Sequence, residues 1–226
     1  MAGHFTRGTF DFLRDLIDNN NRPWFQENKD RYEKYVKEAA LAFITDFGPH
    51  LRKVSKYFVA DPSPVGGSLF RIYRDTRFSK DKTPYKTAIG IRFTHELGKD
   101  VHAPGYYLHI AKDGCFAACG IWRPDGASLG RIRDAIVDDG TAWKRARDAK
   151  SLTSWDWGGD TLKRAPRGYD QDHPLIDDLR RKDFIVSRPL TRKDVTSAEL
   201  PERLAALYRE GTPLQRFICR ALSVPF

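Results

Sequence analysis

The chain has 226 residues, of which 40% are hydrophobic, 12% aromatic and 31% charged, and its formal net charge is +9. This composition is typical of a globular protein and excludes a disordered tail or a fibre. No stretch approaches the roughly 18 apolar residues needed to cross a bilayer, so we expect no membrane partner. A chain of this length can bury one substantial core, which predicts a single domain over residues 1–226.

Apolar residues at helical spacing dominate the first quarter of the chain. They predict one helix over residues 10–17 and a longer helix over residues 25–47. The asparagines at 19–21 end the first helix, because their side chains compete for its backbone groups. Gly48-Pro49 is expected to end the second.

The hydrophobic period then changes from helical to alternating, which predicts a sheet. Residues 106–112 and 115–122 flank Asp113-Gly114, a pair typical of a two-residue type I′ turn, so these two strands should be antiparallel neighbours. Residues 71–73 are expected in the same sheet, and the apolar run 184–186 could add a further strand. With helices returning towards the end of the chain, the fold class is α+β, a mainly antiparallel sheet covered by N-terminal and C-terminal helices.

The segment from Arg71 to Arg92 is the most basic part of the chain. Seven basic side chains against two acidic ones give it a charge of +5. Such a density of like charge costs stability unless acids or a bound anion compensate it. Arginine forks, lysine ammonium groups and hydroxyl donors all suit a phosphate or carboxylate. The candidate ligand-binding residues are Arg71, Tyr73, Arg74, Asp75, Arg77, Lys82, Tyr85 and Lys86.

Two acids within this segment have a different expected role. Asp75 and Asp81 lie among cations that favour their ionised forms, so they are better suited to orienting arginines than to donating protons. A purely structural network of ion pairs would use the same residues. The sequence does not separate this reading from an anion site.

Aromatic residues and a histidine could line a cleft beside the basic segment: Trp24, Tyr107, His109 and Trp122. Tyr107 and His109 share one strand face, and the more apolar opposite face is expected to face the core. For Trp24 and Trp122, a place in the core or at its rim is the simpler interpretation.

The sequence contains no motif typical of a metal-binding or cofactor-binding site. Cys115 and Cys119 would lie about 13 Å apart on an extended strand, too far to share a zinc ion. The histidines lack paired helical spacing, and no phosphate-binding or dinucleotide-binding glycine loop is present. We therefore expect no metal and no cofactor. Three cysteines, including Cys219, do not form a disulfide framework and the first seven residues contain no apolar signal core, which together favour a cytoplasmic location.

The run at residues 71–82, followed by Pro84-Tyr85-Lys86, resembles the signature of the family known as domain of unknown function 2461, found in bacteria and some fungi. Further similar segments are residues 19–25, 104–108, 166–168 and 173–174. The resemblance spans most of the chain and implies an α+β fold. It supplies no activity and no catalytic residues.

Three functions remain open from the sequence. The first is binding, with or without conversion, of a small phosphorylated or carboxylated ligand at the basic segment. The second is a nucleic-acid-binding module in which the same cations track phosphates and aromatic side chains stack on bases. The third is a protein-interaction domain with a structural charge network. Catalytic residues and oligomeric state are not indicated, so enzymatic activity also stays open.

Overall fold

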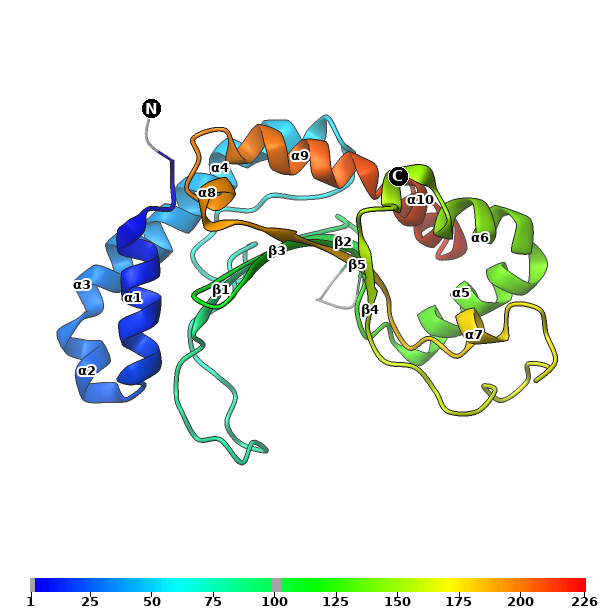
Figure 1. The fold of residues 1–226 in the computed structure, drawn as a ribbon, viewed down its shortest axis with the longest axis horizontal. Coiled ribbons are helices and arrows are strands. Elements are labelled where there is room, and N and C mark those ends of the chain that lie inside the picture. The colour runs from blue at the N-terminus through cyan, green and yellow to red at the C-terminus, as the bar shows by residue number, and fades with distance from the viewer. Residues whose placement is uncertain (1–2, 99–102) are drawn as a thin grey trace.

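A computed structural model gives the fold and describes residues 3–98 and 103–226. Five antiparallel strands form one sheet, and helices cover one of its faces (Figure 1). The order across the sheet is β1 (Ala88–Thr94), β2 (Gly105–Ala111), β3 (Cys115–Ile121), β5 (Phe184–Leu190) and β4 (Asp156–Gly158). The predicted α+β class and antiparallel sheet are therefore confirmed.

The helices precede, interrupt and follow the strands. The N-terminal group is α1 (Arg7–Asp18), α2 (Arg22–Glu27), α3 (Lys29–Tyr32), a π-helical segment (Glu33–Glu38) and α4 (Ala39–Arg52). Between β3 and β5 lie α5 (Gly126–Asp138), α6 (Gly140–Arg147), a 3₁₀ turn (Lys150–Leu152) and α7 (Ile176–Leu179). The C-terminal group is α8 (Arg192–Val195), α9 (Leu200–Glu210) and α10 (Thr212–Ala221).

The predicted end of the long N-terminal helix at Gly48-Pro49 is wrong, because α4 continues to Arg52. A proline inside a helix removes one backbone hydrogen bond and crowds the carbonyl one turn before it. That cost falls on the last turn only, and the extra turn brings Leu51 into the core, where it is fully buried. Burial of a leucine side chain contributes about 2 kcal/mol, which offsets much of the cost.

The core lies between the sheet and the helices α4, α9 and α10. Phe47 of α4 contacts Phe93 of β1, with ring centroids 4.7 Å apart. Tyr208 of α9 stacks on Tyr106 of β2 at 4.6 Å. Leu108 is also completely buried on this face of β2. The more apolar face of β2 is thus the core face, as the alternation predicted.

The opposite face of the sheet carries no helix in the part of the chain that the structure describes. Figure 1 shows α1, α2 and α3 beyond one end of the sheet and α5 and α7 beyond the other, with all of them extending past the plane of the strands on that side. The uncovered face is therefore flanked at both ends.

The predicted hairpin between β2 and β3 is confirmed, but its turn lies one residue earlier than expected. The Ala111 N–H donates to the Gly114 carbonyl at 3.1 Å, so that the chain reverses at residues 112–113. Neither Asp113 nor Gly114 has the left-handed φ that a type I′ turn requires. The register pairs Ile110 with Cys115, both buried, so burial on the core face determined where the turn falls.

The expectation that residues 71–73 lie in the sheet is wrong. Leu69 makes a single bridge to Ile91 at the outer edge of β1, and the chain then leaves the sheet. Tyr73 pairs instead with Tyr85, and the basic loop, defined here as residues 74–84, projects from this pair (Figure 1). Tyr85 is buried and stacks on Phe25 at 4.1 Å, which stabilises this alternative pairing.

Candidate functional site

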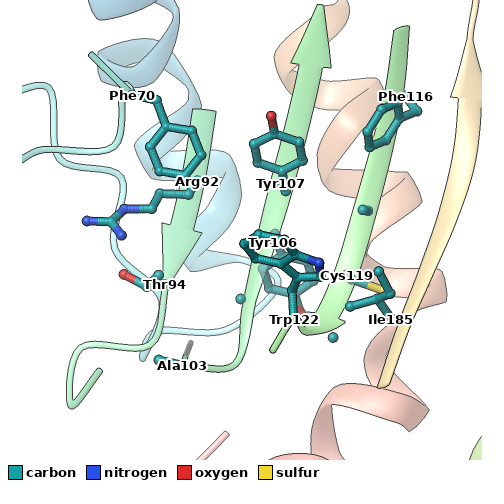
Figure 2. Close-up of a pocket in the computed structure, with 13 residues that line it drawn as sticks. Phe70, Arg92, Thr94, Ala103, Tyr106, Tyr107, Phe116, Cys119, Trp122 and Ile185 are labelled. Atoms are coloured by element: carbon teal, nitrogen blue, oxygen red, sulfur yellow. The ribbon is translucent and has the colours of Figure 1, made fainter. Parts of the chain in front are cut away.

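The uncovered face of the sheet contains a cavity of about 340 Å³ (Figure 2). Tyr107 of β2 and Phe116 of β3 line it because alternate residues of a strand point away from the core face. Phe70, which precedes β1, and Trp122, which follows β3, complete an aromatic wall. We call this space the aromatic cavity.

A glycine in β1 allows two of these rings to lie directly over the sheet. At Gly90 of β1, a Cβ would lie 2.7 Å from a ring carbon of Phe70 and 2.7 Å from the Tyr107 hydroxyl. The absence of a side chain therefore lets Phe70 and Tyr107 approach one another over β1, with ring centroids 5.9 Å apart.

A second and more polar cavity, of about 840 Å³, adjoins the aromatic cavity. Phe70 and Tyr107 line both spaces, so the two are neighbours across these rings. The second cavity, which we call the polar cavity, is also lined by Asn20, Arg74, Asp81, Thr83, Lys86, Thr87 and His109. Its polar side chains come from the segment that follows α1, from the basic loop, from the short segment between that loop and β1, and from β2.

Tyr107 and His109 form a hydrogen-bonded pair at this boundary, with 3.1 Å between the Tyr107 hydroxyl and His109 Nδ1. The imidazole stacks on Phe116 at 4.7 Å. Burial raises the pKa of Tyr107 to about 12 and lowers the pKa of His109 below its usual value. At neutral pH the phenol is therefore protonated and the imidazole is neutral, so each offers a hydrogen-bond donor and an acceptor.

Two cations flank Phe70. Lys86 Nζ lies 5.4 Å from the centroid of the Phe70 ring, and the Arg92 guanidinium carbon lies 5.5 Å from it. Lys86 donates to the backbone oxygen of Arg71 at 2.8 Å. Across the described ranges, neither Lys86 nor Arg92 has an acidic partner. Burial, together with the positive charge of Arg71, lowers the pKa of Lys86.

The basic loop compensates much of its own charge. Arg77 pairs with Asp75 at 2.7 Å, and Arg74 pairs with Asp81. Lys82 donates to a backbone oxygen within the same loop at 2.9 Å. Hydrogen bonds from Arg77 hold the pKa of Asp75 at about 2, and hydrogen bonds from the backbone of residue 83 and from Arg74 hold the pKa of Asp81 at about 2. The two acids thus orient arginines, as their setting in the sequence indicated.

The structure brings only some of the predicted ligand-binding residues together. Arg74, Tyr85 and Lys86 line the polar cavity. The others line neither of the two cavities: Arg71, Tyr73, Asp75, Arg77 and Lys82. Their role in ligand binding stays a prediction.

The four residues suggested for an aromatic cleft do not share one cavity: Tyr107 lines both cavities, Trp122 the aromatic cavity and His109 the polar cavity. Trp122 lines the aromatic cavity and is 46% exposed, but Trp24 packs on Phe12, with ring centroids 5.8 Å apart, away from both cavities. The sequence reasoning missed Phe70, Arg92 and Phe116. The register that pairs His109 with Phe116 could have revealed Phe116, since directly paired residues share a face.

A family model described as "Conserved hypothetical protein (DUF2461)" matches residues 8–217. The chain belongs to this family. The resemblance seen at residues 71–86 is thereby confirmed, and every residue that lines the aromatic cavity of this DUF2461 chain falls within the matched region. Comparison with curated proteins and with solved structures gives no match.

Other features concern metals, thiols and membranes. Among residues 3–98 and 103–226, no cluster of three or more histidine, cysteine or acidic side chains could hold a metal ion. Cys115, Cys119 and Cys219 are buried and not bonded to one another, and burial raises the pKa of all three thiols. No helix within those ranges combines the length and the apolar character required to span a membrane.

Proposed function

We propose that this protein binds a small phosphorylated or carboxylated compound on the uncovered face of its sheet. The apolar part of the compound occupies the aromatic cavity, and Lys86 and Arg92 receive its negative charge. The volume of about 340 Å³ lies in the usual range of small-molecule sites, which are largely apolar with a few placed polar groups.

The observation that carries the proposal is the pair of cations without acidic partners beside Phe70. A partly buried ammonium group that lacks an acid, and that lies near another cation, loses hydration without recovering it by ion pairing. A bound anion would compensate for the lost hydration by pairing with the ammonium group. Lys86 meets this description, since burial and Arg71 both lower its pKa.

This assignment moves the main anion contacts from the basic loop to the wall between the cavities. Arg74 and Arg77 have acidic partners within their own loop, which supports a structural role for their ion pairs. Lys86 keeps the role predicted for it, and Arg92 joins it. Conversion of the ligand is not part of the proposal, and a cytoplasmic setting suits the three unpaired thiols.

A thermal-shift screen of phosphorylated and carboxylated metabolites tests the proposal, because a ligand that binds only the folded protein raises its Tm. We expect at least one such anion to raise Tm, and we expect Lys86→Met or Arg92→Met to reduce the increase. Both changes remove the charge and retain an unbranched side chain. Lys193→Met is the matched control, since Lys193 is exposed, lines neither cavity and belongs to α8, which lies on the covered side of the sheet (Figure 1).

Two outcomes would reject the proposal. If no small anion raises Tm while single-stranded nucleic acid binds with a steep salt dependence, the nucleic-acid alternative replaces it. If an anion does raise Tm but the Lys86 and Arg92 variants respond like the Lys193 control, the anion binds elsewhere.

A further inference from the structure

The two cavities differ in chemistry although they share a wall. The aromatic cavity is bounded by Phe70, Tyr107, Phe116 and Trp122 and contains little polar surface besides Arg92 and Thr94. The polar cavity lies on the other side of Phe70 and Tyr107 and is lined by two cations, several hydroxyl groups, the Asn20 amide and the Asp81 carboxylate, which is paired with Arg74. A molecule that fits both must have a flat apolar part directly next to an anionic, hydroxyl-rich part.

The aromatic cavity suits a planar heterocycle. Its rings are inclined to one another: Tyr107 makes an interplanar angle of 39° with Phe70 and of 53° with Phe116, both at 5.9 Å. Inclined rings enclose a flat molecule by face and edge contacts, which aromatic groups favour. Thr94 supplies a hydroxyl donor that a heterocycle with ring nitrogens or carbonyl oxygens can use, and a plain hydrocarbon ring cannot.

The polar cavity suits a phosphate attached through a short sugar-like linker. Lys86 Nζ is 5.4 Å from the centroid of Phe70, so its positive charge lies just beyond the ring that separates the cavities. Thr87 and His109 line the same space and offer further hydrogen bonds. Lysine binds phosphate as a point charge, and neutral donors beside it complete such a site.

We infer that the ligand is a nucleoside monophosphate, with its base in the aromatic cavity and its phosphate beside Lys86. This inference rests on the proposed function and names the ligand class of the same site. A free nucleotide is favoured over a polynucleotide because both arginines of the basic loop, which could extend a phosphate track, are paired with acids.

Isothermal titration calorimetry with four probes tests the inference: adenosine 5′-monophosphate, adenosine, ribose 5-phosphate and indole-3-carboxylate. The other three nucleoside monophosphates are then compared with the first. We expect the nucleotide to bind at least tenfold more tightly than either adenosine or ribose 5-phosphate, because only the nucleotide fills both cavities.

Two variants separate the cavities. Lys86→Met should weaken binding of the nucleotide about tenfold, as expected for the loss of a charge-assisted contact, and should change the affinity for adenosine less than twofold. Phe116→Leu should weaken binding of the nucleotide and of adenosine by similar factors, because the change removes part of the wall around the base. Phe78→Leu is the matched control for the aromatic change, since Phe78 is 95% exposed on the basic loop.

A second measurement does not depend on how well the variants fold. Trp122 lines the mouth of the aromatic cavity, so addition of nucleotide to the wild-type protein should shift its indole N–H signal in a ¹H–¹⁵N spectrum. The signal of Trp143, which is completely buried on the core side, should stay in place. A Trp122 signal that does not move at saturating nucleotide overturns the inference.

The results also distinguish the inference from the proposed function. If indole-3-carboxylate binds and the Lys86 or Arg92 variants weaken it while no nucleotide binds, the inference is overturned and the proposed function stands. If no small anion binds at all, both are overturned. An oligonucleotide that binds more than 100-fold more tightly than the nucleotide, with a steep salt dependence, also overturns the inference.

Discussion

Gly120 is the glycine whose replacement should damage the sheet most. It lies in β3 with a φ of +127°, and a Cβ there would overlap the backbone carbonyl of Phe184 in β5. Backbone atoms of a central strand cannot move aside as a flexible side chain could. We expect Gly120→Ala to lower the free energy of unfolding by about 3 kcal/mol or more, measured by urea denaturation.

Gly114→Ala is the control for that change, because Gly114 lies in the hairpin turn and a Cβ there meets nothing within 4 Å. It should change the free energy of unfolding by less than about 1 kcal/mol. Equal losses in the two variants would show that the close contact between β3 and β5 is not the cause.

His109 should make stability depend on pH. Burial lowers its pKa in the folded protein below 6.5, so the unfolded chain takes up the proton first as the pH falls. The free energy of unfolding is therefore not reduced by His109 above about pH 6.5, where the imidazole is neutral in both states. It decreases as the pH falls from there towards the pKa of His109 in the folded protein. Between about pH 7.5 and 5.5 the wild type should lose more stability than His109→Gln, measured by urea denaturation. Parallel losses would contradict this.

At the scale of elements, Asn20 holds the base of the basic loop. Its side-chain amide donates to the Tyr85 carbonyl at 2.9 Å, and its side-chain oxygen accepts from the Tyr85 N–H at 3.0 Å. These two bonds connect the C-terminal end of α1 to the pair formed by Tyr73 and Tyr85. The loop therefore depends on one side chain that is distant in sequence.

Asn20→Ala should release the basic loop. We expect faster trypsin cleavage after Arg77 and Lys80, because local opening of the loop exposes its backbone to the protease. Tm should change by only a few degrees, since the core is untouched. Asn19→Ala is the control: Asn19 donates only to Asp15 within the end of its own helix. Equal cleavage rates in both variants would contradict the proposed anchoring.

The sequence predicted those elements whose signals are local. The first helix, its end at the asparagine run and the two strands on either side of Asp113-Gly114 depend on spacing and turn residues within a few positions. The pairing of β3 with β5 joins residues about 70 positions apart, such as Ala117 with Arg188, and no local pattern encodes it.

The same limit applies to the site. Alternation placed Tyr107 and His109 on the face away from the core, whereas Trp122, for which a place in the core or at its rim was the simpler interpretation, lines the aromatic cavity. That this face stays uncovered depends on where the helices dock. Phe70 reaches the cavity through backbone bonding to Gly90, which the sequence does not show. Charge density pointed to the basic loop, but charge alone does not reveal which cations already have acidic partners.

At the scale of the whole molecule, one continuous core should give one unfolding transition. Buried residues from Phe5 near the start to Leu222 near the end form a single cluster. We expect the unfolding curves from tryptophan fluorescence and from far-ultraviolet circular dichroism to coincide in urea. Tryptophan fluorescence reports mainly on the region of α6 and β4, which contains Trp143, Trp155 and Trp157, whereas circular dichroism reports on all helices. Transitions separated along the urea axis would show that the two ends unfold independently.

The edges of the sheet bear on how copies of the chain behave at high concentration. An edge strand with free backbone groups is a template for another strand and thus for aggregation. At β1 the outer edge already bonds to the preceding segment, since Phe70 N–H donates to Gly90 and Arg92 N–H donates to Ser68, both at 2.9 Å. At the other edge β4 has only three residues. Neither described edge presents a long free strand, so the protein can leave one broad face of its sheet open without offering a path to strand-by-strand polymerisation.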